Sequence, residues 1–380
     1  MKLVTHFFLF FFTTQVFFAQ KLDVNWIFET KNNVIASPLI YENIVYVGDE
    51  SGVFYALSQK SGHKIWQYNT DGIIQAKATI ADDIVFFESG NVFYALDRKS
   101  GKLQWKFDSK FQVNEFMYQG VKFKNKIDPF DFDHSKAFLY EGVLYIGSRK
   151  GILYGFQIKD GKVIVKVSSD ESSPIRSSPL VNNGKLFFGD WNGIVYCYDL
   201  NNKKMIWKKK TYRKAKPYET FGGINSEFVL YDGLLFFGAR NYMLNILIAD
   251  SGEKEWTHMD SKEGWIWGSP EIRKDTLFIG GSDNFKMTSF NPNNGKEYWS
   301  HIRTKNIIGR AIVTDEWVMY TSGNAYDINQ EGEFVVLQKK DGKLVDSYVT
   351  EKALLSSPSL NDNQIIFSCY NGKVYSFRIN

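Results

Sequence analysis

The chain has 380 residues, of which 44% are hydrophobic, 17% aromatic and 23% charged. This composition excludes an intrinsically disordered chain, a collagen-like sequence and a scaffold dense in disulfides. The formal net charge of +4 is too small to indicate binding to nucleic acid. Beyond the N-terminus, no apolar run approaches the ~18 residues that a membrane span requires.

The first predicted element is an export signal over residues 1–20. Lys2 supplies a positive start, a phenylalanine-rich run follows, and Ala19 is a small residue suited to cleavage. The polar residues at 13–15 interrupt the apolar run, which argues against a retained membrane anchor. Because no cysteine lies near the cleavage position, the sequence predicts an exported protein, periplasmic or extracellular, that is not a lipoprotein.

A repeating unit occupies the remainder of the chain. Residues 36–68 and 76–107 align with a period of 39, which superimposes Gly62 on Gly101 and Trp66 on Trp105. Each unit contains four short apolar runs separated by turn residues, which is typical of a four-stranded antiparallel sheet. Six further units are recognised at residues 139–167, 177–208, 226–257, 268–300, 309–348 and 356–380.

The last unit ends after three strands, and the pattern of the missing fourth strand occurs alone near the N-terminus. Residues 24–28 read VNWIF, so a strand over residues 22–29 is expected to complete the last blade with residues 354–380. An open ring would leave an apolar blade face uncovered. The sequence therefore predicts an all-β, eight-bladed propeller that forms a single domain over residues 21–380. A linear solenoid is the alternative, and the split unit argues against it.

The repeat resembles that of the pyrroloquinoline-quinone (PQQ) propellers. The resemblance covers nearly the whole mature chain and is carried by Ser178-Pro179, Val47-Gly48, Tyr94-Ala95-Leu96-Asp97 and Gly101-Lys102-Leu103-Gln104-Trp105. In that family, large dehydrogenases hold PQQ and Ca²⁺ over the channel and oxidise alcohols or sugars. Small members include the propeller subunit that assists outer-membrane protein assembly, which binds partner proteins and does no chemistry. The length of this chain and the absence of an adjacent cysteine pair favour the small type, although the assembly subunit is usually a lipoprotein.

A tryptophan recurs four residues after the turn glycine of most units. In the PQQ-like family such a tryptophan docks on the Gly-Lys turn of the adjacent blade, and the same structural role is expected here. The candidates are Trp26, Trp66, Trp105, Trp207, Trp256 and Trp299. Val165 and Asp346 take this position in blades three and seven, so those two joints are expected to be weaker. Cys197 and Cys369 fall in opposite blades and are expected to be free thiols.

Two side-chain positions at the start of each innermost strand are expected to face the channel. The candidate ligand-binding residues at these positions are Gln75, Lys77, His134, Lys136, Arg176, Asn225, Glu227, Trp267 and Arg310. Four cations against one carboxylate would favour an anion, and PQQ carries three carboxylates. A water-filled channel without a ligand is the simpler interpretation. Because no aspartate is available as a base and one glutamate is a poor Ca²⁺ site, no catalytic residue and no metal site is predicted.

Insertions between strands mix basic and aromatic residues and are expected on the face of the channel mouth. They occupy residues 110–130, 208–221, 258–267 and 322–332. Such residues anchor protein interfaces. We therefore interpret the chain as a monomeric, non-catalytic platform for an envelope protein, without a cofactor and without a nucleic-acid partner. The alternatives are a quinoprotein that binds PQQ with calcium and oxidises an alcohol or sugar, and a carbohydrate-binding propeller that uses Tyr118, Phe123, Tyr212 or Tyr218.

Overall fold

The computed structural model describes residues 22–110, 136–211, 223–259, 264 and 266–379, together with the backbone of residues 115–118 and 121–124. The predicted export signal and the candidate residue His134 lie outside these ranges. Among the described residues, no helix has the length and apolar character needed to cross a bilayer.

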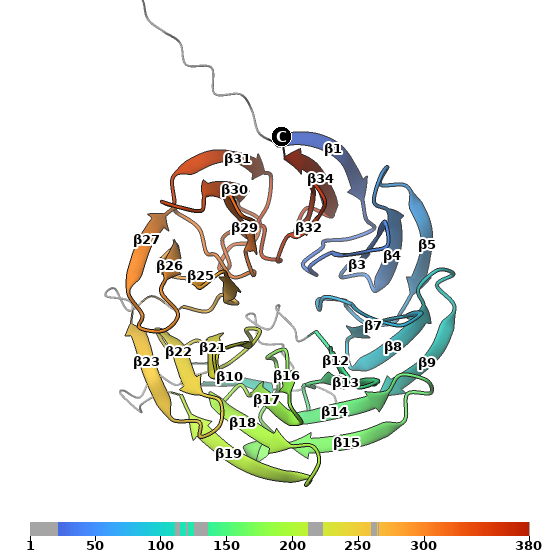
Figure 1. Cartoon of the computed structure of the whole chain (residues 1–380). Coiled ribbons are helices and arrows are strands. Elements are labelled where there is room, and N and C mark those ends of the chain that lie inside the picture. Colours follow the sequence, from blue (N-terminus) through green and yellow to red (C-terminus); the bar gives the residue numbers. More distant parts are fainter. Residues whose placement is uncertain are drawn as a thin grey trace, which may run out of the picture.

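The structure is a ring of eight four-stranded antiparallel sheets, which confirms the predicted eight-bladed propeller (Figure 1). Blades one to four consist of β2 (Leu39–Tyr41), β3 (Ile44–Gly48), β4 (Val53–Ser58) and β5 (Lys64–Asn69); β6 (Thr79–Ala81), β7 (Ile84–Ser89), β8 (Val92–Asp97) and β9 (Leu103–Asp108); β12 (Phe138–Tyr140), β13 (Val143–Ile146), β14 (Ile152–Gln157) and β15 (Val163–Ser168); and β16 (Leu180–Asn182), β17 (Lys185–Gly189), β18 (Ile194–Asp199) and β19 (Lys204–Lys210).

The other four blades continue the ring in chain order. They consist of β20 (Val229–Tyr231), β21 (Leu234–Gly238), β22 (Met243–Ile248) and β23 (Lys254–Met259); β24 (Glu271–Arg273), β25 (Thr276–Gly280), β26 (Lys286–Phe290) and β27 (Glu297–Ile302); β28 (Ile312–Val313), β29 (Trp317–Ser322), β30 (Gly332–Gln338) and β31 (Leu344–Thr350); and β32 (Ser359–Asn361), β33 (Gln364–Cys369), β34 (Lys373–Ile379) and β1 (Leu22–Glu29). A separate two-stranded sheet joins β10 (Glu115–Tyr118) to β11 (Val121–Lys124), and a short 3-10 helix spans Asp170–Ser172.

Blade eight is built from both ends of the chain, as the split repeat predicts. The N-terminal strand β1 pairs antiparallel with the C-terminal strand β34 from Leu22 opposite Ile379 to Glu29 opposite Lys373 (Figure 1). The backbone N–H of Leu22 also donates to the carboxylate of Asp346 in blade seven, at 3.1 Å. The ring is therefore closed by hydrogen bonds and packing rather than by a continuous chain.

The hydrophobic core lies between the blades. Eight clusters of buried side chains are each shared by two adjacent blades, one at every joint of the ring. At the first joint, Phe54 of β4 stacks on Phe87 of β7 with ring centroids 3.9 Å apart. Because a neighbour covers each face of a blade, the middle strands β3 and β4 are buried along almost their whole length, whereas the outer strand β5 exposes every second side chain.

Every tryptophan of the repeat lies against the turn glycine of the next blade. A side-chain carbon added at Gly62, Gly101, Gly161, Gly252, Gly295 or Gly342 would come within 2.7 Å of the indole ring of Trp26, Trp66, Trp105, Trp207, Trp256 or Trp299, respectively. Each indole N–H donates to a backbone carbonyl of that next blade, for example Trp105 to Ile158 at 2.7 Å. Only glycine accommodates both this close approach and the positive φ of the turn, +70° at Gly161.

Both cysteines are free and buried, as the repeat register predicts. Cys197 lies between Phe187 and Trp207 in the strand register, in the position that Ala56 takes in blade one. Burial raises the pKa of the Cys197 thiol to about 12, which is the environment of a packing residue rather than of a nucleophile.

Candidate functional site

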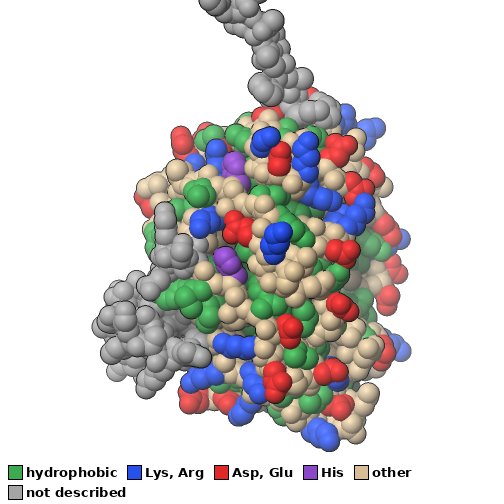
Figure 2. Space-filling model, turned by 60° about the vertical axis from the view of Figure 1, so that its left-hand side comes forward, with side chains coloured by type: hydrophobic (Ala, Val, Ile, Leu, Met, Phe, Trp, Pro, Cys, Tyr) green, Lys and Arg blue, Asp and Glu red, His purple; other side chains and the backbone are tan. Residues whose placement is uncertain are grey.

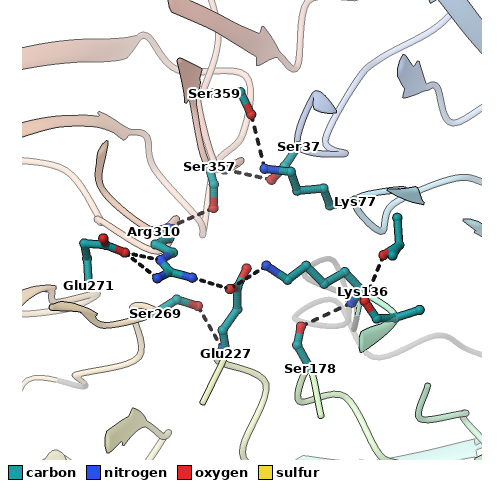
Figure 3. Close-up of polar contacts among 12 residues, drawn as sticks. Ser37, Lys77, Lys136, Ser178, Glu227, Ser269, Glu271, Arg310, Ser357 and Ser359 are labelled. Carbon is teal, nitrogen blue, oxygen red and sulfur yellow. Dashed lines mark hydrogen bonds and ion pairs between the residues drawn. The ribbon is translucent and has the colours of Figure 1, made fainter. Parts of the chain in front are cut away.

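One of the two channel-facing positions, two residues before each innermost strand, brings one side chain from each blade to a single level of the channel (Figure 3). We call these eight residues the channel ring: Ser37, Lys77, Lys136, Ser178, Glu227, Ser269, Arg310 and Ser357. Each lies two residues before the first residue of an innermost strand, so the convergence of these strands on the propeller axis brings them together. All of them except Arg310 line a small cavity of about 20 Å³ at this level, together with Asn225.

Glu227 is the centre of an ion-pair network in the channel ring. Its carboxylate accepts from Lys136 Nζ at 2.7 Å and from Arg310 Nη1 at 2.8 Å (Figure 3). Burial acts to raise the pKa of Glu227, but the positive charges of Lys136 and Arg310 outweigh it and lower the pKa to about 2. Glu227 is therefore a structural carboxylate that is ionised at neutral pH, not a general base.

The site contains a second carboxylate, that of Glu271, which was not predicted from the sequence. Arg310 also pairs with Glu271 on β24. Glu271 lies two residues beyond Ser269, which places it on the same face of the strand. Extending the channel-facing alternation by one more position would have found it. The charged set in the channel is thus three cations and two carboxylates.

Lys77 has a different environment from the other two cations. Among the described residues, its one hydrogen bond joins Nζ to the Oγ of Ser359 at 3.2 Å, and it pairs with no carboxylate. Burial lowers the pKa of Lys77 to about 8, and the charges of Lys136 and Arg310 act in the same direction while Glu227 opposes them. Lys77 is therefore the cation of the three whose charge the described residues compensate least.

At the other channel-facing position, four residues before each innermost strand, four of the eight residues form an apolar layer. Ile35, Trp267, Ile308 and Leu355 cluster with Ala325, from the segment between β29 and β30, and with Ala353. Trp267 is only 1% exposed, and the Arg240 guanidinium lies 5.4 Å from the centre of its ring. Its indole therefore presents no open face on which a flat ligand could stack.

The remaining candidates lie around this apolar layer. Arg176 and Asn225 are each 4% exposed. Gln75 is half-buried and donates to the carboxylate of Glu50 at 3.4 Å. The structure thus brings together Lys77, Lys136, Glu227 and Arg310, with Asn225 beside them. Arg176 does not line the cavity that the other three cations share.

A larger cavity of about 400 Å³ extends from the channel ring along the innermost strands. Its lining includes the ring residues Lys77 and Arg310 and the apolar residues Leu39, Ile312 and Leu360. The latter three lie on β2, β28 and β32, toward the turns that lead to β3, β29 and β33. Because strands alternate in direction, these turns lie opposite the connections between blades. The cavity beside the charged residues therefore opens on the face opposite the connections between blades. The sequence predicted the channel mouth on the other face, which carries those connections.

PQQ does not fit this donor set. The quinone carries three carboxylates, whereas the three cations and two carboxylates of the cavity leave a net charge of about +1. No aromatic side chain lines this cavity within the described part of the chain, so nothing there would stack on a flat ring system. Among the described residues, no cluster of His, Cys, Asp and Glu is suited to a metal ion.

Replacing Glu227 with glutamine is expected to lower the free energy of unfolding by about 3 kcal/mol at neutral pH. The folded-state pKa near 2 lies below the ordinary value of 4.5, so the stabilisation is present above pH 4.5 and is lost as the pH falls toward 2. Urea unfolding of wild type and Glu227→Gln at several pH values between 7 and 2 measures the difference. The exposed Glu255→Gln is the matched control. A difference in unfolding free energy between wild type and Glu227→Gln that stays constant down to pH 2 would contradict the low pKa of Glu227.

Comparison with known proteins gives one family and several solved structures. The sequence model of the family described as outer membrane protein assembly factor BamB matches residues 22–115, 88–191 and 191–380. No match was found among curated proteins.

The similar solved structures include a BamB and two dehydrogenases. BamB from Moraxella catarrhalis is 14% identical, with a TM-score of 0.72 over 94% of this chain and 100% of the BamB chain. A europium-containing methanol dehydrogenase is 11% identical, with a TM-score of 0.75 over 95% of this chain and 94% of that one. The quinohemoprotein alcohol dehydrogenase of Comamonas testosteroni is 12% identical, with a TM-score of 0.71 over 94% and 76%. At these identities the likeness shows the fold alone.

Proposed function

Because the chain belongs to the outer membrane protein assembly factor BamB family, we propose that it is an exported, non-catalytic propeller that binds a partner protein in the cell envelope and supports outer-membrane protein assembly. The observation that carries this proposal is the family match, which extends over all eight blades. The channel agrees with it, because its carboxylates are held in ion pairs with cations rather than poised for proton transfer.

The binding face that we propose is the side of the propeller that carries the connections between blades. Met259 ends β23 and is 63% exposed, and Ile302 ends β27 and is 62% exposed. Tyr326, in the segment between β29 and β30, is 59% exposed. These three side chains come from the adjacent blades five, six and seven, on the side toward which fourth strands run. Exposed Met and Tyr side chains are enriched in protein interfaces.

The outer surface of these blades is less suited to a partner. Figure 2 faces the outer strands of these blades and shows basic and acidic side chains interspersed, with hydrophobic side chains between them. A surface of mixed charge keeps a protein soluble and gives no strong attraction of one sign. The two-stranded β10–β11 sheet is separate from the eight blades and adds backbone that a partner could contact.

Photo-crosslinking in the native envelope tests the proposed face. A crosslinking amino acid at position 302 is expected to give a discrete adduct with one envelope protein, because Ile302 lies on that face. Position 65 is the matched control, since Ile65 is 50% exposed but lies at the start of the outer strand of blade one. Equal adducts from both positions, or none from position 302, would contradict this face.

Deletion of the protein tests the role itself. Loss of the chain is expected to lower the amounts of outer-membrane proteins in the source organism, and a plasmid copy should restore them. Quantitative proteomics of the envelope measures this change. An unaltered outer-membrane proteome would argue against a role in assembly.

A further inference from the structure

The channel ring contains more hydrogen-bond donors than acceptors. Ser178, Ser269 and Ser357 each accept a backbone N–H from the preceding blade, at distances of 2.8–3.2 Å, and Ser37 accepts the N–H of Ser357 at 2.8 Å (Figure 3). A serine hydroxyl that accepts in this way still has a proton to donate. Among the described residues, no acceptor is found for any of these four hydroxyl protons. All four line the 20 Å³ cavity.

Asn225 provides a second, independent observation at the same cavity. Its side chain is 4% exposed, and neither Oδ1 nor Nδ2 has a hydrogen-bond partner in the described part of the chain. It lines the cavity together with the four serines. Buried amides are normally hydrogen-bonded, so an unpaired one at a cavity indicates a group that occupies it.

The charges define the kind of group that would complete the site. Lys77, Lys136 and Arg310 carry three positive charges, and Glu227 and Glu271 carry two negative charges, so one positive charge is uncompensated among the described residues. Lys136 and Arg310 are paired with carboxylates, which leaves Lys77 as the cation available to a ligand. A monoanion would balance the site, whereas a dianion would exceed it.

We propose that the channel ring binds the carboxylate of a small organic monoanion, which enters from the face opposite the connections between blades. One carboxylate oxygen occupies the 20 Å³ cavity, which has room for about one water-sized group. The Lys77 ammonium, the ring serine hydroxyls and the Asn225 amide donate to the carboxylate. The body of the ligand lies in the 400 Å³ cavity, where Leu39, Ile312 and Leu360 can contact a short alkyl chain. This site is separate from the proposed partner-binding face and does not depend on it.

Calorimetric titration of the purified protein with butyrate in a low-chloride buffer tests the proposal. Butyrate supplies one carboxylate and a short apolar chain, and butyramide is the uncharged control ligand. We expect butyrate to bind and butyramide not to bind. Because the pKa of Lys77 is lowered to about 8, binding at pH 8 should take up protons, and buffers of different ionisation enthalpy would report this uptake.

Three variants locate the binding. Lys77→Met should weaken butyrate at least about tenfold and abolish the proton uptake. Asn225→Asp places a carboxylate at the cavity and should also weaken binding, by charge repulsion. Lys204→Met removes an exposed lysine of β19 and should leave the affinity unchanged. Absence of butyrate binding at millimolar concentration, or binding that neither Lys77→Met nor Asn225→Asp alters, would overturn the proposal.

The same titration distinguishes two sources of the carboxylate. A short peptide with a free C-terminus is compared with its amidated form. Tighter binding of the free peptide than of butyrate assigns the site to peptide C-termini. Tighter binding of butyrate assigns it to free carboxylic acids.

Discussion

Removal of residues 22–29 is expected to abolish cooperative folding of the propeller. The deletion removes β1, which pairs with β34 along its whole length, and takes away Leu22 and Trp26, which are 2% and 9% exposed. It also removes the indole that covers Gly62 of blade one and its hydrogen bond to the Gln59 carbonyl at 2.8 Å. Loss of two buried side chains and a strand pairing costs an amount comparable to the whole stability of a domain, about 5–15 kcal/mol.

Thermal unfolding by circular dichroism and size-exclusion chromatography measure this effect. A chain that begins at residue 30 is compared with one that begins at residue 22. The exposed edge of β34 should also cause the shorter chain to associate through that edge. A monomer with an unchanged melting temperature would show that β1 does not close the ring.

Trp105→Ala is expected to lower the free energy of unfolding by about 3–5 kcal/mol. The indole is 8% exposed and packs between blades two and three, against Phe86 and Phe156. Its N–H donates to the Ile158 carbonyl at 2.7 Å, and alanine loses this bond together with the packing. Trp105→Phe keeps most of the apolar contact and should cost only about 1–2 kcal/mol.

Val165→Ala is the matched control for this tryptophan. Val165 takes the same repeat position in blade three but is a smaller, half-buried side chain without a polar group. Its replacement should cost about 1 kcal/mol. Guanidinium unfolding of the three variants gives the comparison. Equal losses for Trp105→Ala and Val165→Ala would contradict the view that the tryptophans hold neighbouring blades together.

The same comparison bears on the two joints without a tryptophan. Blade seven has Asp346 in this position, and its carboxylate accepts the backbone N–H of Leu22 instead of packing on a glycine turn. The weaker joint predicted there coincides with the place where the ring is closed by the N-terminal strand. The weaker joints at blades three and seven remain a prediction.

The sequence predicted some of the channel residues correctly but not their ion pairs. The alternation of side chains along a strand identified Lys77, Lys136, Glu227 and Arg310 as neighbours, although they come from four different blades. It could not identify which of them are paired. Glu271 was missed because only two positions of each innermost strand were considered. Its presence, together with the position of Arg176 outside the cavity, changes the net charge from the expected +3 to about +1.

The repeat period, the tryptophan and glycine positions and the split last unit were enough to determine the eight blades and their closure, because each blade is a local pattern repeated along the chain. The direction in which the channel opens was decided only by the tertiary structure. Ile35, Trp267, Ile308 and Leu355 come from four different blades, and the segment between β29 and β30 covers them through Ala325. No local sequence pattern shows that these apolar residues meet at one level. Because they are buried there, the channel ring is reached from the opposite face.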